Sequence, residues 1–135
     1  LYQLAQTIGN LLAPYQIPLL INDRLDIALA VGAQGVHLEK ESFDWQTARR
    51  LMGDHALVGV SVHTRQELEQ AQSWEVDYLA CGPIFPTFSK AYSHPEWGLD
   101  RIGLASKDSG IPVVGVGGIG LANIAQVKRA GLPCV

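Results

Sequence analysis

Short apolar runs rich in β-branched residues recur along this chain, and each is followed by an amphipathic stretch. Within a run the apolar residues are nearly continuous and do not alternate with polar ones, which is typical of strands covered on both faces by crossover helices. The pattern predicts an α/β fold with a parallel sheet. The expected strands are residues 17–21, 35–38, 57–61, 76–81 and 111–116, with a last strand beginning near Cys134.

Helix signals fill the segments between these runs. Apolar residues recur at helical spacing in residues 24–31, and Thr64 and Glu67 form the T-x-x-E pattern of a capping box. Further helices are expected at residues 1–12, at residues 45–52 behind the N-cap Asp44, and at residues 121–130.

The helix expected at residues 45–52 has two distinguishable faces. At helical period, Ala48 and Leu51 are expected to face inward, and Arg49 and Arg50 are expected to face outward.

The spacing of the strands indicates the architecture. The strands start at ordinary βα intervals, apart from one long interval at residues 82–97. This interval holds three prolines, which favours a lengthened loop, whereas an open doubly wound sheet needs a longer crossover where its strand order reverses. Lengthened loops are typical of a (β/α)8 TIM barrel. We therefore predict a single domain over residues 1–135, an incomplete barrel of about six βα units that lacks the first strands and the C-terminal end.

Composition excludes several classes of function. With 47% hydrophobic and 17% charged residues, the chain can bury a core and is not disordered. The net charge of −3 offers no basic surface for nucleic acid, and no apolar run approaches the roughly 18 residues of a membrane span. Cys81 and Cys134 end apolar runs without C-x-x-C spacing, which predicts buried, reduced thiols in a cytoplasmic protein. The expected partner is a small molecule.

Polar residues gather at the carboxyl ends of the expected strands, where a barrel places its chemistry. We therefore expect a site there. These strand ends are Asn22 and Asp23, residues 37–39, residues 61–64, residues 82–90, and Gly117 and Gly118.

Residues 115–120 match the pattern G-x-G-x-x-G after an expected strand and before an expected helix. A dinucleotide-binding fold would need an acidic residue about 20 positions further on, beyond the end of the chain. In either fold the stretch offers N–H groups at a helix N-terminus, with no Cβ to block an oxyanion. We expect a phosphate site at Gly117 and Gly118, and the alternative is that these glycines serve only a tight turn.

Two polar groups at early strand ends are candidates for binding. Asp23, next to Asn22, can hold a metal or orient a substrate; alternatively, Asp23 and Arg24 form an N-cap with a surface ion pair. Ser61 lies at the end of its strand and can donate to an anion.

The long loop and two histidines supply the other candidates. Lys90 lies close to Thr87 and Ser89, a cation and two hydroxyls that suit a phosphate or pyrophosphate, unless Lys90 is a solvated loop lysine. His37 and His63 can act in the site or take structural roles. No zinc spacing, P-loop or G-x-S-x-G pattern is present in the sequence.

Five of these motifs occur in order across nearly the whole chain. They are residues 21–23, residues 35–38, residues 59–64, residues 77–87 followed by Lys90, and residues 111–119. Together they resemble the ordered motifs of the thiamine phosphate synthase and thiazole tautomerase (TenI-like) family. The resemblance implies a (β/α)8 barrel and a thiazole phosphate ligand.

The resemblance also implies roles in the synthase branch, where thiazole phosphate displaces pyrophosphate from an aminopyrimidine pyrophosphate with Mg²⁺. There Asp23 matches a magnesium carboxylate, and Ser61 and Lys90 match pyrophosphate contacts. Thr87 lies on the thiazole side, and Gly118 matches the cradle of the thiazole phosphate.

One departure from the synthase pattern weakens the implied magnesium site. Ser42 stands where that branch has its second magnesium carboxylate, and Lys40 adds a positive charge nearby. This favours the tautomerase branch, which needs no metal. That branch often has a histidine where Pro83 stands, so His63 or His37 would have to move the proton. We expect His63 and Lys90 as catalytic residues. For the function, a non-catalytic phosphate-binding barrel and a dinucleotide-binding oxidoreductase remain open alternatives. For the assembly, a homo-oligomer remains open.

Overall fold

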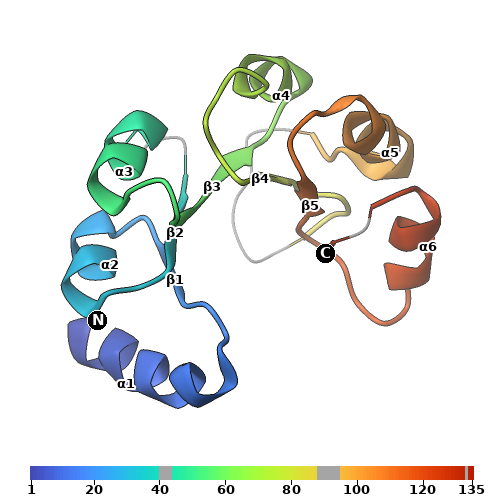
Figure 1. Ribbon diagram of the computed structural model, residues 1–135. Helices are drawn as coiled ribbons and strands as arrows, with labels where there is room; N and C mark the ends of the chain where they lie inside the picture. The colour runs from blue at the N-terminus through green and yellow to red at the C-terminus, as the bar shows by residue number, and fades with distance from the viewer. Residues whose placement is uncertain (40–43, 88–94, 133) are drawn as a thin grey trace. The chain divides into compact units, whose positions relative to one another are not determined.

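The computed structural model describes residues 1–39, 44–87, 95–132 and 134–135. Helices and strands alternate along the chain, as the sequence predicts (Figure 1). The order is α1 (Tyr2–Leu12), a 3₁₀ turn (Ala13–Tyr15), β1 (Leu20–Asn22), α2 (Leu25–Val31), β2 (Gly35–Leu38), α3 (Trp45–Met52), β3 (Leu57–Val62), α4 (Arg65–Ala71), β4 (Tyr78–Cys81), α5 (Gly98–Asp108), β5 (Val113–Gly115) and α6 (Ile124–Arg129).

The chain divides into two compact units, residues 1–60 with 75–77 and residues 61–74 with 78–135. In the first unit β1 pairs with β2 and β2 pairs with β3, both in parallel. The register sets Gly35 opposite Leu57, and a Cβ on Gly35 would lie 2.3 Å from the Leu57 carbonyl oxygen. Only glycine fits at this position of the paired strands. The helices α2 and α3 lie on the same side of β1 and β2 (Figure 1).

In the second unit β4 pairs with β5 in parallel, so that Leu79 lies opposite Val113 and Cys81 opposite Gly115. Val114 forms an isolated parallel bridge to Cys134, at the place where the sequence predicts a further strand. The core of this unit is apolar and includes Leu79, Ile84, Ile102, Val127 and Leu132.

These pairings confirm the α/β class and the parallel strands. Within each unit the paired strands are also neighbours in sequence, as they are in a (β/α)8 barrel. Closure into an incomplete eight-stranded barrel stays a prediction, as does a single domain over residues 1–135. None of the helices in the described ranges has the length and apolar character that crossing a membrane requires.

Two helices differ from the prediction. The helix α5 (Gly98–Asp108) is absent from the predicted helices, because glycine at its start and at Gly103 interrupts the helical pattern. A Cβ on Gly103 would lie 2.4 Å from the carbonyl oxygen of Ala130, so this glycine allows close packing against the end of α6. The helix α6 begins at Ile124, three residues later than predicted, because residues 121–123 form a turn.

The cysteine prediction is half right. Cys81 is free and fully buried in β4, whereas Cys134 is free and exposed. Cys134 was predicted to be buried, and its position just after the apolar Leu132 did not place its own side chain in the core.

Burial raises the pKa of the Cys81 thiol to about 12. The thiol therefore stays protonated at neutral pH, and only a thiolate attacks alkylating agents. We expect iodoacetamide at pH 8 to leave Cys81 unmodified in the native full-length protein and to modify it after unfolding in urea. Peptide mapping by mass spectrometry measures this, and rapid native labelling of Cys81 would contradict it.

Candidate active site

The predicted site residues fall into two groups, one in each compact unit. Asn22 and Asp23 belong to the first unit. Ser61, His63, Thr87, Gly117 and Gly118 belong to the second unit.

In the first unit Asp23 joins the carboxyl ends of two neighbouring strands. Its backbone N–H donates to the carbonyl oxygen of His37 at 2.8 Å, and its Oδ1 accepts from the backbone N–H of Glu39 at 2.8 Å. Asn22 donates from Nδ2 to Asp23 Oδ2 at 2.7 Å. Asp23 adopts φ = 61°, a left-handed conformation that aspartate tolerates better than most residues. The carboxylate is thus held by donors at the tips of β1 and β2.

The alternative role of Asp23, an ion pair with Arg24, is wrong. Arg24 instead forms a bidentate ion pair with Asp26. Its Nε donates to Oδ1 at 2.8 Å, and its Nη2 donates to Oδ2 at 2.6 Å. The Arg24 guanidinium lowers the pKa of Asp26 to about 2. Arg24 is the N-cap residue of α2, and its side chain makes no capping bond. The Asp23 carboxylate is therefore used neither for this ion pair nor for capping.

In the described part of this unit, Asp23 is the predicted residue whose carboxylate could hold a magnesium ion. No cluster of three or more His, Cys, Asp or Glu side chains with metal-binding geometry occurs among the described residues. Mg²⁺ is commonly bound by one or two carboxylates together with substrate phosphates and water. Ser42 and Lys40, the two residues expected to weaken a magnesium site, lie outside the described residues.

In the second unit His63 is held by the segment that follows β4. Its Nδ1 lies 3.1 Å from the carbonyl oxygen of Gly82. A carbonyl oxygen only accepts, so Nδ1 carries the proton in this contact. The backbone N–H of His63 donates to Glu67 Oε2 at 2.7 Å, and Thr64 Oγ1 accepts from the Glu67 N–H at 3.2 Å. Only the Thr64 contact of the predicted capping box therefore forms, because the Glu67 carboxylate accepts from the His63 N–H and not from the Thr64 N–H.

The segment after β5, residues 116–120, is called the glycine loop, and it is anchored through three successive carbonyl groups. The Val116 oxygen accepts from the N–H of Ile84 at 2.9 Å, and the Gly117 oxygen accepts from the N–H of Phe85 at 3.2 Å. The Gly118 oxygen accepts from Asn123 Nδ2 at 2.9 Å. In a trans peptide, the carbonyl and the following N–H point in opposite directions. The N–H groups of Gly117, Gly118 and Ile119 therefore point away from these partners.

Those three N–H groups meet no acceptor among the residues that the structure describes. Backbone N–H groups in succession within a turn are a common way to bind an anion. The arrangement can accept a phosphate at Gly117 and Gly118.

The same glycines are also required by the turn. Gly117 has φ = 88° and Gly118 has φ = 69°, a region that other residues rarely adopt. A Cβ on Gly117 would lie 2.8 Å from Pro83 Cβ, and a Cβ on Gly118 would lie 2.7 Å from the Phe85 carbonyl oxygen. Gly117 and Gly118 therefore allow both the tight turn and the outward direction of the N–H groups. The expectation that the donors sit at a helix N-terminus is wrong, because α6 begins only at Ile124.

Two of the remaining predicted residues are placed by their position in the chain and their burial. Ser61 is a half-buried residue of β3, and Thr87 is half-buried at the end of a described range. Ser89 and Lys90 lie outside the described residues, so the predicted catalytic lysine is not placed. The roles of all these residues stay predictions. Sequence reasoning missed Asn123, although an asparagine shortly after a glycine turn is a frequent partner of backbone groups.

A pocket of about 330 Å³ in the second unit lies elsewhere. It is formed mainly by α4 and α5, and His63 is the only residue of the predicted site among its lining residues. The residues that line this pocket include none from the glycine loop, so the pocket does not coincide with it.

Known proteins with similar sequences match nearly the whole chain. The family model described as thiamine monophosphate synthase matches residues 1–135. A thiamine-phosphate synthase of Syntrophomonas wolfei is 40% identical over 130 residues, which are 96% of this chain and 62% of that protein. A thiamine-phosphate synthase of Dictyoglomus thermophilum is 39% identical over 134 residues, covering 99% of this chain and 60% of that protein.

A solved structure matches as well. It is a thiamine phosphate pyrophosphorylase from Pyrococcus furiosus, with a TM-score of 0.85 and 31% identity, and the match covers 97% of this chain and 62% of the other. The chain thus spans about three fifths of the length of these relatives. The family model extends over both compact units, including Asp23 and the glycine loop. By these matches, the chain belongs to the thiamine monophosphate synthase family, as its motifs predicted.

Proposed function

We propose that the protein is a thiamine phosphate synthase, which joins an aminopyrimidine pyrophosphate to a thiazole phosphate and releases pyrophosphate. The observation that carries the proposal is the glycine loop with three outward N–H groups, which suits the phosphate of the thiazole substrate. The names of the relatives reported above support the same reaction.

In this reaction the thiazole ring nitrogen forms a bond to the exocyclic carbon of the pyrimidine, and the bond from that carbon to pyrophosphate breaks. The pyrophosphate leaves with the electron pair of that bond. The chain's task is therefore to orient the two substrates and to stabilise the charge on the leaving group. The N–H groups of Gly117, Gly118 and Ile119 would hold the thiazole phosphate and thereby fix the position of its ring.

The residues of the first unit would serve the leaving group. Asp23 would hold Mg²⁺, with its carboxylate oriented by the Glu39 N–H and by Asn22. When bound, the ion neutralises the charge that develops on pyrophosphate. Ser61 belongs to the second unit. The resemblance alone assigns the Ser61 hydroxyl and the Lys90 charge to pyrophosphate.

A thiazole tautomerase is the second candidate, favoured by the serine at position 42 in place of a carboxylate. In that reaction a proton moves on a thiazole carboxylate phosphate and no metal is needed, with His63 as the acid and base. The reported relatives carry the name of the synthase and lend this branch no support.

The test of the proposal is turnover by the full-length protein with both substrates and Mg²⁺. We expect thiamine phosphate and pyrophosphate in equal amounts, and no turnover after chelation of the metal. Asp23→Asn is expected to lower kcat/KM by about 100-fold, because it removes the charge that holds the ion. Chromatography of thiamine phosphate and a pyrophosphate assay measure these rates.

The control variant is Asp26→Asn, which removes an exposed carboxylate three positions away that pairs only with Arg24 among the described residues. It should keep the wild-type rate. Conversion of the thiazole carboxylate phosphate without coupling would favour the tautomerase, and binding of thiazole phosphate without any turnover would favour a non-catalytic phosphate-binding barrel.

A further inference from the structure

The side chain of Asn123 lies back across the glycine loop. Its Nδ2 donates to the carbonyl oxygen of Gly118 at 2.9 Å, and its Oδ1 accepts from the N–H of Gly120 at 2.8 Å. We infer that Asn123 is the positioning residue of the glycine loop. It aims the Ile119 N–H at the phosphate and keeps the Gly120 N–H away from it. For the identity of the ligand, the inference rests on the proposed function.

The geometry of one peptide plane carries the first half of this role. Asn123 holds the carbonyl group of Gly118, and the Ile119 N–H is the other end of the same planar unit. Gly118 has φ = 69° and no side chain to restrict its rotation, so this plane depends on an external anchor. Without the Asn123 amide the plane can turn, and the third donor of the loop is no longer aimed.

The second half of the role is a choice among donors. The Gly120 N–H is occupied by Asn123 Oδ1, whereas the Ile119 N–H meets no acceptor among the described residues. One carboxamide thus satisfies a carbonyl and an N–H that flank Ile119. The two contacts leave the intervening N–H as the donor for a ligand.

Asn123 also gives up another use of its side chain. It is the N-cap residue of α6, a position where an asparagine oxygen usually accepts from the first helical turn. Here the side chain makes no capping bond, because both ends of the amide contact the loop. The Asn123 side chain therefore stabilises the glycine loop and makes no hydrogen bond to the first turn of this six-residue helix.

The chemistry of the amide explains why few residues can replace it. The site needs a donor and an acceptor on one planar group. Aspartate keeps the acceptor for Gly120 but cannot donate to Gly118, and it brings a negative charge next to an anion site. Alanine loses both contacts without adding charge.

The experiment compares Asn123→Ala, Asn123→Asp and a control in the full-length protein. The control is Gln126→Ala, which removes an exposed amide three residues further on, in α6. Calorimetry measures the binding of thiazole phosphate, of its dephosphorylated alcohol and of inorganic phosphate. Steady-state kinetics measure KM for each substrate and kcat.

For Asn123→Ala we expect the Kd and KM for thiazole phosphate to rise about tenfold, since one charge-assisted hydrogen bond is lost. The KM for the pyrimidine substrate and the affinity for the alcohol should stay within twofold. Asn123→Asp should raise the Kd for both phosphate ligands further. Gln126→Ala should match the wild type.

Three results would overturn the inference. One is equal binding of thiazole phosphate by Asn123→Ala and Gln126→Ala, and another is an equal loss for the alcohol and the phosphate, which indicates a merely structural role. The third is a wild-type protein that binds no thiazole phosphate, which overturns the proposed function as well. A wild-type protein that binds thiazole phosphate but does not couple it contradicts the synthase only, and the binding comparison still decides the role of Asn123.

Discussion

Replacement of Gly118 by alanine is expected to weaken the binding of thiazole phosphate by about 100-fold. The new Cβ would lie 2.7 Å from the Phe85 carbonyl oxygen and 2.8 Å from the Pro86 carbonyl oxygen, and φ = 69° is unfavourable for alanine. The loop must therefore move, which disturbs two or three donors that each contribute about 1.5–3 kcal/mol to holding an anion. The strained backbone should also lower the free energy of unfolding by about 1–3 kcal/mol. Calorimetry and urea unfolding measure the two effects.

The matched control is Gly120→Ala in the same loop. Gly120 has no positive φ, and a Cβ there would meet nothing within 4 Å. This variant should bind and unfold like the wild type. If both variants bind equally well, the loop does not hold the phosphate; if both lose binding, the difference in local packing does not govern the site.

The second large effect is expected at the ion pair of Arg49 and Asp77 in the first unit. Arg49 Nη2 lies 2.7 Å from Asp77 Oδ2, and the same oxygen accepts from the buried N–H of Val58 at 2.7 Å. Arg49 also donates to the carbonyl oxygen of Ala56 at 2.7 Å and to that of Glu75 at 3.1 Å. The guanidinium thus connects α3 to the chain before β3 and before β4.

Asp77→Ala is expected to lower the free energy of unfolding of the full-length protein by about 2–4 kcal/mol. It leaves a largely buried guanidinium without its carboxylate and the Val58 N–H without its acceptor. Asp77→Asn should cost less, because the amide oxygen can still accept from Val58. Urea unfolding followed by circular dichroism measures both variants.

The control is the exposed pair of Arg65 and Glu69 on α4, where the side chains are 70% and 64% exposed, against 13% and 37% for Arg49 and Asp77. Solvent screens such a pair, so Glu69→Gln should leave the unfolding midpoint unchanged. A similar small effect for Asp77→Ala would show that burial does not strengthen the Arg49 pair.

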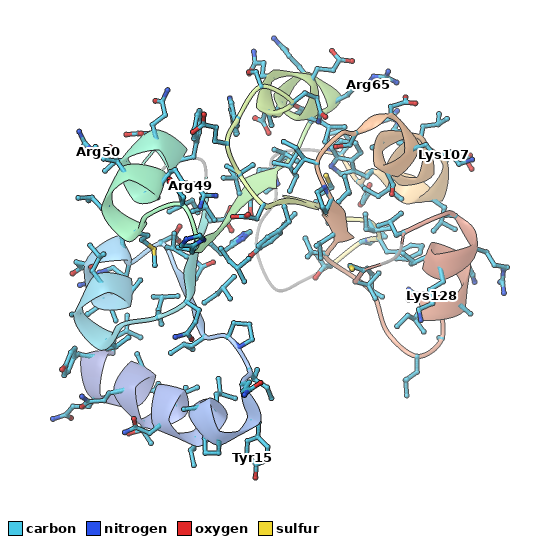
Figure 2. All side chains as sticks on the ribbon, in the orientation of Figure 1. Tyr15, Arg49, Arg50, Arg65, Lys107 and Lys128 are labelled. Atoms are coloured by element: carbon cyan, nitrogen blue, oxygen red, sulfur yellow. The ribbon has the colours of Figure 1, made fainter. Side chains whose placement is uncertain are left out.

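The same residue shows where pattern reasoning failed. Arg49 was expected to face outward and Leu51 inward, yet Leu51 is 51% exposed and Arg49 is directed toward the strands. Figure 2 shows Arg49 on the strand side of α3 and Arg50 on the outer side. An arginine is favoured inside only when carbonyl and carboxylate groups from other segments surround it. Those groups come from residues 53–56 and 75–77, so periodicity within one helix could not show them.

Other parts of the fold depended on local signals and were predicted well. The strand β2 and the helix α3 have the predicted bounds, since continuous apolar runs and an N-cap aspartate act within a few residues. The N-cap bond of Asp44, which accepts from the Thr47 N–H at 2.7 Å, lowers the pKa of Asp44. Shorter strands such as β5 differ from the prediction at their ends, where pairing with a neighbour decides which residues belong to the strand.

The sequence likewise predicted some features of the candidate site and not others. The residue types of the site, an aspartate after β1 and a diglycine after β5, could be read from the chain itself, because their chemistry belongs to the residues. Only the tertiary structure decided what each group contacts: Asp23 receives the Glu39 N–H instead of pairing with Arg24, and Asn123 holds the Gly118 carbonyl. The physical reason is that hydrogen bonds depend on position and direction in space, and segments distant in the chain supply many of the partners.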